Sequence, residues 1–392
     1  MPLSSLDTDR LGEALALAHG AIGQTEPNPR VGCIIGSETG EVFGCGATQQ
    51  AGGSHAEIMA LREAQTQGHD TRGATVWVTL EPCAHHGRTP PCCDSLIAAG
   101  VGRVVVAVQD PFAQVGGAGI ARMRAAGVRV EFADESTALA AWELNIGFFS
   151  RVLRQRPWVR LKTASSLDGR TALDNGVSQW ITSEAARADG HAWRKRSSAI
   201  LTGVGTVLAD NPRLDVRLVP STWQPLRVVV DSSLRTPAAA RVLAPPGRSI
   251  IAAAAPDPRR ASAFQEAGTE VLSLPGADGK VNLPALLAEL ARRGVNELHV
   301  EGGRGLTTAM LRSGLVDEVL LYVAPLLLGG GRGMVDWAPL QQLQDGLKFT
   351  WVDTLAVAPD LRLRLRPVDA WLSAFTKRLQ VSADFTGAVP PE

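Results

Sequence analysis

The sequence predicts an α/β protein of two domains. The chain has 392 residues, which is too long for one typical domain. Hydrophobic residues make up 45% and charged residues 20%, a balance typical of globular proteins that bury a core. Strand-like and helix-like segments alternate through the first half, whereas the second half is richer in strands.

The first half reads as short strands interleaved with helices. A helix is expected at 55–68, with Ile58, Leu61 and Ala64 on one apolar stripe, and another at 92–101, which Gly100 would end. The strand-like segments are apolar and bounded by turn residues, and they cover 31–36, 41–46, 74–80, 103–110 and 128–132. This succession predicts a layered domain with parallel neighbouring strands.

A helical pattern around 136–157 ends in a connecting segment and a proline, which places the domain boundary near 147–156. We therefore expect domains at 1–148 and 149–367 and a C-terminal tail at 368–392. The second domain has helical patterns at 283–294 and, after the EGGRG turn, at 306–314. Its strand-like segments cover 158–164, 197–204, 226–231, 248–255, 296–303, 316–330 and 360–367.

The charge balance, the lack of long apolar runs and the cysteine content argue against several classes of function. The chain has 39 basic and 39 acidic residues, so no global field attracts nucleic acid. The N-terminal stretch MPLSSLDTDR lacks the apolar core of a signal peptide, and no run approaches the about 18 apolar residues of a membrane span. We expect a cytoplasmic protein with no membrane partner. Five cysteines, an odd number, favour thiolate chemistry or core packing over a disulfide framework.

The most specific motif is a histidine and cysteine pattern. GGSHAEIMAL, at 52–61, and TLEPCAHHGRTPPCCDSL, at 79–96, together contain H-x-E, then P-C, then a further cysteine. That order is the signature of zinc deaminases. His55, Cys83 and Cys92 fit a site that leaves a fourth position for water, whose pKa zinc lowers. Glu57 fits the carboxylate that moves the proton from the water to the ring nitrogen and the departing ammonia.

Two alternatives remain open for the metal ligands. Eight residues separate Cys83 from Cys92, more than the two of the short motif, and Cys93 could replace Cys92 as third ligand. We prefer Cys92 because it follows Pro90-Pro91 at a helix start, where the helix dipole favours a thiolate. His85 could complete a closed structural site, but Glu57 would then have no role. Cys33 and Cys45 lie in strand-like segments and are expected in the core.

The segments TEPNPRVGCII, HAEIMAL and TLEPCAHHGRTPPCCDSLIAAG resemble the cytidine-deaminase superfamily, and most closely the deaminase half of the bifunctional riboflavin-biosynthesis deaminase/reductase family. KTASSLDGRTAL, SQWITS, ILTGVGTVLADNPRLDVR and HVEGGRGL resemble the reductase half of that family. The resemblance spans about residues 8–367. It implies a cytidine-deaminase-like α/β/α domain followed by a dihydrofolate-reductase-like α/β domain, with small phosphorylated pyrimidine substrates and a homodimer through the reductase sheet.

For the first half, the resemblance implies hydrolytic removal of the 2-amino group from a diamino-pyrimidinone that carries a ribosylamino 5′-phosphate. Asn28 would contact the pyrimidine or ribose, and His86, Arg88 and Thr89 would reach the phosphate. The family usually has D-P-N-P after the 103–108 strand, whereas this chain has Asp110-Pro111-Phe112-Ala113. Of these four positions, only Asp110 is taken over from the family as a candidate site residue. A nucleic-acid base deaminase and a zinc-stabilised scaffold are competing hypotheses, and the neutral charge argues against the first.

In the second half, the residues alone predict only a phosphate cradle at the EGGRG turn, which lacks the Rossmann pattern. The resemblance implies NADPH-dependent reduction of a ribosyl group to a ribityl group, with Lys162 or Asp210 handling the proton. It assigns substrate contacts to Ser178, Arg194, Leu214, Arg217 and Glu301. It assigns NADPH contacts to Ala164, Trp180, Thr206, Asp210, Gly303, Arg304, Gly305, Leu306, Thr307, Thr308 and Ala309. We add Ser232 or Arg235 for the 2′-phosphate of NADPH.

Overall fold

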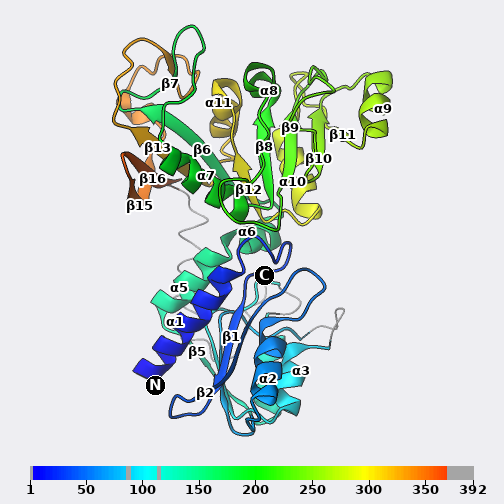
Figure 1. Cartoon of the computed structure of the whole chain (residues 1–392), viewed down its shortest axis with the longest axis vertical. Coiled ribbons are helices and arrows are strands. Elements are labelled where there is room, and N and C mark those ends of the chain that lie inside the picture. The colour runs from blue at the N-terminus through cyan, green and yellow to red at the C-terminus, as the bar shows by residue number, and fades with distance from the viewer. Residues whose placement is uncertain (1–2, 85–89, 113–115, 369–392) are drawn as a thin grey trace. The chain divides into compact units, whose positions relative to one another are not determined.

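The computed structural model describes residues 3–84, 90–112 and 116–368, which form two compact units (Figure 1). The chain divides between Arg154 and Gln155. Apart from Val368, the predicted C-terminal tail lies outside the described residues. None of the helices in the described part of the chain is long and apolar enough to cross a membrane.

The first unit is built on a five-stranded sheet in the order β2-β1-β3-β4-β5. Its strands are β1 (Gly32–Gly36), β2 (Val42–Ala47), β3 (Thr75–Val78), β4 (Arg103–Val106) and β5 (Arg129–Phe132). The last three strands run parallel, as expected, whereas β1 pairs antiparallel with both β2 and β3. The parallel strands are apolar because helices cover both faces of the sheet.

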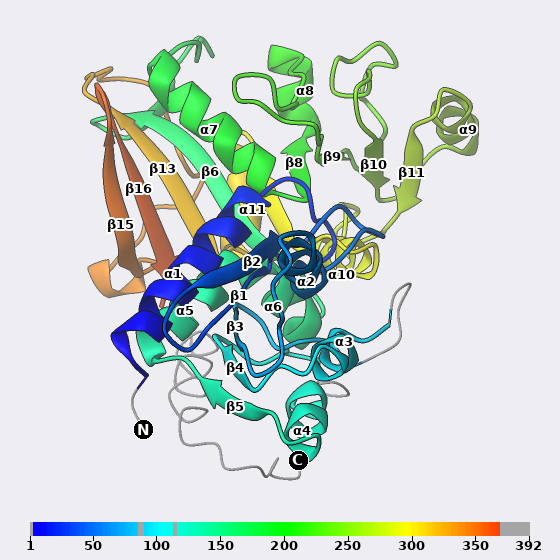
Figure 2. The same cartoon turned by 60° about the horizontal axis from the view of Figure 1, so that its bottom comes forward.

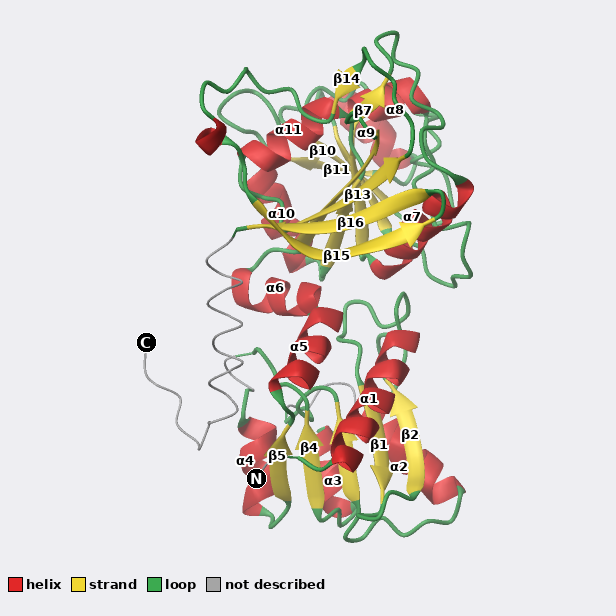
Figure 3. Ribbon diagram, turned by 90° about the vertical axis from the view of Figure 1, so that its left-hand side faces the viewer, coloured by secondary structure: helices red, strands yellow, loops and turns green. Residues whose placement is uncertain are grey.

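Helices lie on the two sides of this sheet (Figure 3). Helix α1 (Ser5–Gly20) packs on one side together with α5 (Glu135–Leu144), and α6 (Ile146–Arg154) follows. Helices α2 (Ala56–Thr66), α3 (Cys92–Ala98) and α4 (Ala118–Ala125) lie on the other side. The result is a three-layered α/β/α unit, with the start of α2 and the start of α3 on the same face.

The predicted apolar stripe of α2 is wrong in detail. Ile58 and Leu61 are only partly buried, and the fully buried stripe is Ala56, Ala60 and Ala64. The reason is the close approach of the helix to β2: a Cβ at Gly46 would lie 2.5 Å from the Ala56 carbonyl oxygen. Only small side chains fit between elements at this separation.

The second unit is built on a nine-stranded sheet in the order β11-β10-β9-β8-β12-β6-β13-β16-β15. Its strands are β6 (Trp158–Ser166), β8 (Ala199–Gly203), β9 (Leu226–Val230), β10 (Ser249–Ala253), β11 (Glu270–Ser273), β12 (Glu297–Val300), β13 (Glu318–Ala324), β15 (Phe349–Val357) and β16 (Asp360–Pro367). The seven strands from β11 to β13 are parallel, and β16 and β15 continue antiparallel to one free edge (Figure 2). A two-stranded ribbon joins β7 (Arg170–Ala172) and β14 (Arg332–Gly333).

The helices of this unit are α7 (Glu184–Arg196), α8 (Val204–Asp210), α9 (Pro258–Glu266), α10 (Leu283–Arg292) and α11 (Arg304–Arg312), with a short 3₁₀ turn at Leu343–Asp345. The main core lies between the sheet and α10 and α11, where Leu286, Leu290 and Met310 are fully buried. The predicted α/β class and the predicted helix at 283–294 are confirmed. Helix α7 and strand β15 were not predicted.

Candidate active sites

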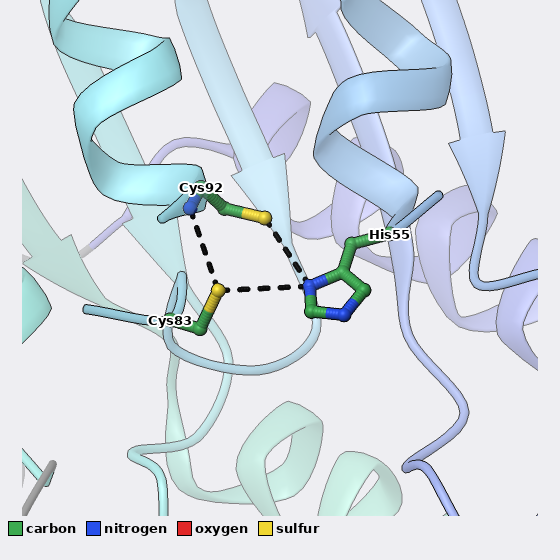
Figure 4. A group of neighbouring side chains, drawn as sticks. All are labelled: His55, Cys83 and Cys92. Carbon is green, nitrogen blue, oxygen red and sulfur yellow. Dashed lines mark hydrogen bonds between the residues drawn. The ribbon is translucent and has the colours of Figure 1, made fainter. Parts of the chain in front are cut away.

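Three side chains of the first unit converge on one point (Figure 4). His55 Nδ1 lies 3.6 Å from the Cys83 sulfur and 3.3 Å from the Cys92 sulfur. All three ligand atoms lie within 4.8 Å of one another. These are the residues that the H-x-E and P-C pattern selects, and we call them the metal trio.

Two members of the metal trio lie at helix starts, and the third lies on the segment that follows a strand. His55 is the N-cap of α2, and Cys92 is the first residue of α3, behind the N-cap Pro91. Cys83 follows β3, and its sulfur accepts a hydrogen bond of 3.4 Å from the Cys92 backbone N–H. Element ends place side chains at one edge of the layers without disturbing the ladders.

The trio fits zinc by its donor chemistry. One imidazole nitrogen and two thiol sulfurs are the ligand types of a catalytic zinc site, in which a fourth position is left for water. Cys93, the alternative ligand, is buried and lies 3.6 Å from the Asp94 carboxylate, outside the trio. His85, His86, Arg88 and Thr89 lie outside the described residues.

Glu57 lies two residues after His55, in the first turn of α2, and the residue is only 3% exposed. Burial, and then the charge of Cys83, raise the pKa of Glu57 to about 7. A carboxyl group that titrates near neutrality is suited to move protons. The hydrogen bond from Cys92, in contrast, lowers the pKa of the Cys83 thiol.

The other predicted deaminase residues lie on loops. Asn28 lies in a turn before β1. Its backbone N–H donates to the Thr25 carbonyl oxygen at 2.8 Å and so closes the turn. Asp110 follows β4 and accepts the Phe112 backbone N–H at 2.9 Å. The Phe112 ring, which stands where the family has asparagine, packs edge-on against Phe148 with the ring centroids 5.8 Å apart. An aromatic contact therefore replaces the amide of the family pattern.

In the second unit, the candidate residues gather where parallel strands end. Thr206 and Asp210 lie on α8, directly after β8, and Ser232 follows β9. Glu301 follows β12, and Gly303 is the N-cap of α11. Because β9, β8, β12 and β6 are adjacent and parallel, their carboxyl ends share one edge, which is where open α/β sheets bind ligands.

The predicted glycine-rich turn is the start of a helix. Residues 304–309 belong to α11, and the Gly303 N–H donates to Thr206 Oγ1 at 3.0 Å. Gly303, Arg304 and Gly305 are exposed, whereas Thr307 and Thr308 are buried. Thr308 Oγ1 donates to the Arg304 carbonyl oxygen at 2.7 Å.

Arg194 and Glu301 form a paired contact. Arg194 Nη2 donates to Glu301 Oε2 at 2.9 Å, and Arg194 Nη1 donates to the Asp215 carbonyl oxygen at 2.9 Å. Burial raises the pKa of Glu301, but Arg194 outweighs it and holds that pKa well below its usual range. Asp215 also pairs with Arg217 at 2.6 Å.

Leu214 and His191 belong to the same region as Arg194 and Glu301. The Leu214 side chain is buried in the core among Ile200 and Val204, so only its backbone is available to a substrate. His191, which was not predicted as a site residue, accepts the Arg217 backbone N–H at 3.1 Å on Nδ1. Burial, followed by the charges of Arg194 and Arg217, lowers the pKa of His191 to about 4.

The remaining candidates lie on β6 and on the loop before α7. Lys162 and Ala164 are on β6, and the Lys162 ammonium lies 5.6 Å from the centroid of the Tyr322 ring. Burial lowers the pKa of Lys162. Ser178 and Trp180 are on the loop, and the Trp180 ring is 65% exposed under the Arg187 guanidinium.

Family models match both units. The cytidine and deoxycytidylate deaminase zinc-binding region matches residues 5–108, and the RibD C-terminal domain matches residues 157–363. Fold and site thus define a two-domain enzyme of the zinc deaminase and reductase class.

Relatives of known identity cover almost the whole chain. A riboflavin biosynthesis protein RibD of Escherichia coli is 43% identical over 368 residues, which are 91% of this chain and 98% of that protein. The solved RibD of Acinetobacter baumannii aligns with a TM-score of 0.84 at 38% identity over 93% of this chain and 99% of its own. A solved deaminase/reductase from Thermotoga maritima aligns with a TM-score of 0.80 at 31% identity, over 92% of this chain and 99% of its own.

The chain belongs to the RibD family of riboflavin biosynthesis proteins. It is a bifunctional deaminase and reductase, with a zinc-dependent deaminase domain and an NADPH-dependent reductase domain.

Proposed function

We propose that this chain catalyses two consecutive steps on one pyrimidine. The first hydrolyses 2,5-diamino-6-ribosylamino-4(3H)-pyrimidinone 5′-phosphate, with one water consumed and one ammonia released. The second reduces the ribosyl group of 5-amino-6-(5-phosphoribosylamino)uracil to the ribityl group, with NADPH and one proton consumed. The name of the Thermotoga maritima relative, a diaminohydroxyphosphoribosylaminopyrimidine deaminase/5-amino-6-(5-phosphoribosylamino)uracil reductase, supports this order.

The observation that carries the first step is the metal trio beside the buried Glu57. His55, Cys83 and Cys92 would hold zinc, which supplies a Lewis acid that activates water. Glu57 takes a proton from the attacking water and passes it to the pyrimidine ring nitrogen, and later to the departing ammonia. Asn28 orients the pyrimidine or ribose.

For the second step, the carboxyl edge of the nine-stranded sheet would hold both reactants. NADPH, when bound, supplies a hydride to C1′ of the opened ribose. Residues of α8, the α11 start and the loop around Trp180 bind that cofactor, and Ser232 faces its 2′-phosphate. Arg217, whose side chain is 42% exposed, suits phosphate, since a guanidinium group can bind it through two hydrogen bonds. Arg194 would contact the substrate beside it, with its Nε and Nη2 on Glu301. Glu301 fixes the Arg194 guanidinium. Lys162 or Asp210 supplies the one proton, which the ribose oxygen takes up as the C1′–O bond breaks, before the hydride reaches C1′.

One experiment tests both steps together. The purified zinc-loaded chain is incubated with the diamino substrate, first without NADPH and then with it. Ammonia should appear in the first stage, and oxidation of NADPH should begin only after deamination. An intact zinc-loaded protein that releases no ammonia would contradict the proposal.

Replacing the carboxylate of Glu57 tests whether this residue transfers protons or binds the metal. The Glu57→Gln variant should lose at least about 100-fold in the rate of ammonia release, because the amide cannot accept the proton. Its zinc content should remain near one per chain. The control is Glu63→Gln on the same helix, where the carboxylate accepts the Cys45 backbone N–H instead. Loss of zinc from the Glu57 variant would mean that Glu57 is a ligand.

We also propose that the chain works in the cytoplasm as a homodimer joined through the reductase sheet. The free edge of that sheet supports the homodimer. Strand β15 ends the strand order, and it exposes Trp351 at 66% and Leu355 at 46%. A long apolar edge strand favours pairing with another strand.

A further inference from the structure

A carboxylate near the metal trio is buried among backbone N–H groups. Glu81 is 4% exposed and lies two residues before Cys83. Its Oε2 accepts the N–H of Gly117 at 2.9 Å and of Asp110 at 3.2 Å. Its Oε1 accepts the N–H of Gly119 at 3.1 Å and of Ile120 at 3.3 Å. Burying a carboxylate is costly unless such partners satisfy it.

Three of these four donors, on Gly117, Gly119 and Ile120, come from the start of α4, which has no side-chain cap of its own. The N-cap of α4 is Gly117, whereas five other described helices are capped by a neighbouring side chain. The local caps are Ser4 for α1, Asp134 for α5, Ser183 for α7, Asp257 for α9 and Asn282 for α10. In α4 the capping carboxylate comes from 36 residues away, measured from Gly117. The cap therefore also ties the helix to the segment that carries Cys83.

The same segment is held from two further sides. The Glu81 backbone N–H donates to the Val108 carbonyl oxygen at 2.9 Å, and the Cys93 N–H donates to the Cys83 carbonyl oxygen at 3.2 Å. Helix α4 also touches it directly, because a Cβ at Gly119 would lie 2.2 Å from the Pro82 carbonyl oxygen. Residues 81–83 are thus fixed between β4, α3 and α4.

We propose that Glu81 is a positioning residue for zinc: through the α4 start it sets the place of Cys83 relative to His55 and Cys92. The inference rests on the proposed role of the metal trio. Metal ligands need support from the residues behind them, and loss of such support typically weakens metal binding about 10- to 100-fold. Glu81 provides that support through the backbone and does not touch the metal itself.

The test measures zinc affinity of the full-length chain by competition with a chromophoric chelator. Glu81→Gln turns an N–H donor toward other N–H donors, and it should weaken zinc binding about 10- to 100-fold. The matched control is Asp134→Asn, which weakens a carboxylate cap at α5 away from the trio. That control should keep the wild-type zinc affinity even where it lowers the melting temperature.

A second variant reaches the same segment without touching the carboxylate. Gly119→Ala places a methyl group against Pro82, so it should also weaken zinc binding, and the visible spectrum of the cobalt-loaded protein should change in both variants. Wild-type zinc affinity in the folded variants, or equal weakening in Asp134→Asn, would overturn the inference. If Glu81→Gln does not fold, Gly119→Ala decides alone. A wild-type chain that binds no zinc would instead refute the proposed function.

Discussion

Cys92 and Cys93 are adjacent on α3, and the helix turns their side chains about 100° apart. Only the Cys92 sulfur joins the metal trio, while the Cys93 sulfur lies beside Asp94. Cys92→Ser should therefore abolish tight zinc binding and ammonia release. Cys93→Ser should keep about one zinc per chain and lose only stability, since Cys93 is fully buried. Zinc content by atomic absorption checks the pair; equal loss in both variants would contradict the assignment.

Single site residues could be predicted from the sequence where the chemistry requires particular residue types at particular spacings. His55, Cys83 and Cys92 stand out because few other functions need an imidazole and two thiols in that order. His191 and Asp215 could not be found in this way, because their role depends on contacts between segments far apart in the chain. Leu214 shows a further limit, since the sequence did not reveal that its side chain belongs to the core.

Helix α1 is attached to the first sheet through one buried carboxylate. Asp7 Oδ1 accepts the Trp77 indole N–H at 2.8 Å and an Arg103 guanidinium N–H at 2.6 Å. Burial raises the pKa of Asp7, but the hydrogen bonds from Arg103, Trp77 and Ser4 outweigh it and lower the pKa well below its usual range. A depressed carboxyl pKa stabilises the fold above the unfolded pKa, near 4, and that stabilisation is lost as pH falls further.

Asp7→Asn should accordingly lower the free energy of unfolding at pH 7 by about 2 kcal/mol. The difference from wild type should shrink as the pH is lowered from about 4 toward 2, because the Asp7 carboxyl of the unfolded chain then binds a proton while that of the folded chain stays ionised. Urea unfolding at pH 7 and pH 3 measures both differences. Asp9→Asn, an exposed neighbour on the same helix, is the control. A difference that does not change with pH would rule out this account.

Elements were predictable where one apolar pattern decides them, as in α10 and most of the parallel strands; β11, which has no buried residue, was missed. Helix α7 was missed because it buries only Ala186, Gly190 and His191 and therefore has no apolar stripe. Strand β15 was missed because most of its residues are exposed, so the alternation of a half-buried strand is weak. The α2 stripe was misjudged because the approach of Gly46 to the helix is a property of the packed layers.

For the whole molecule, the free edge at β15 predicts the state of assembly. Wild-type chain should elute as a dimer in size-exclusion chromatography with light scattering, and Trp351→Glu should shift it toward monomer by placing a charge on that edge. Leu343→Glu is the control, because Leu343 is fully exposed on the 3₁₀ turn away from β15. A monomeric wild type, or a dimer unaffected by Trp351→Glu, would refute the dimer.

The metal trio affects the folding and stability of the protein as well as its chemistry. His55 and Cys83 are 28 positions apart, and Cys83 and Cys92 are 9 apart. An ion held by all three would act as a staple that closes two loops of the chain, and loop closure removes disorder mainly from the unfolded chain. A bound metal also stabilises the folded state by mass action. In cells short of zinc, we therefore expect newly synthesised copies to be degraded faster, so that enzyme abundance falls together with activity.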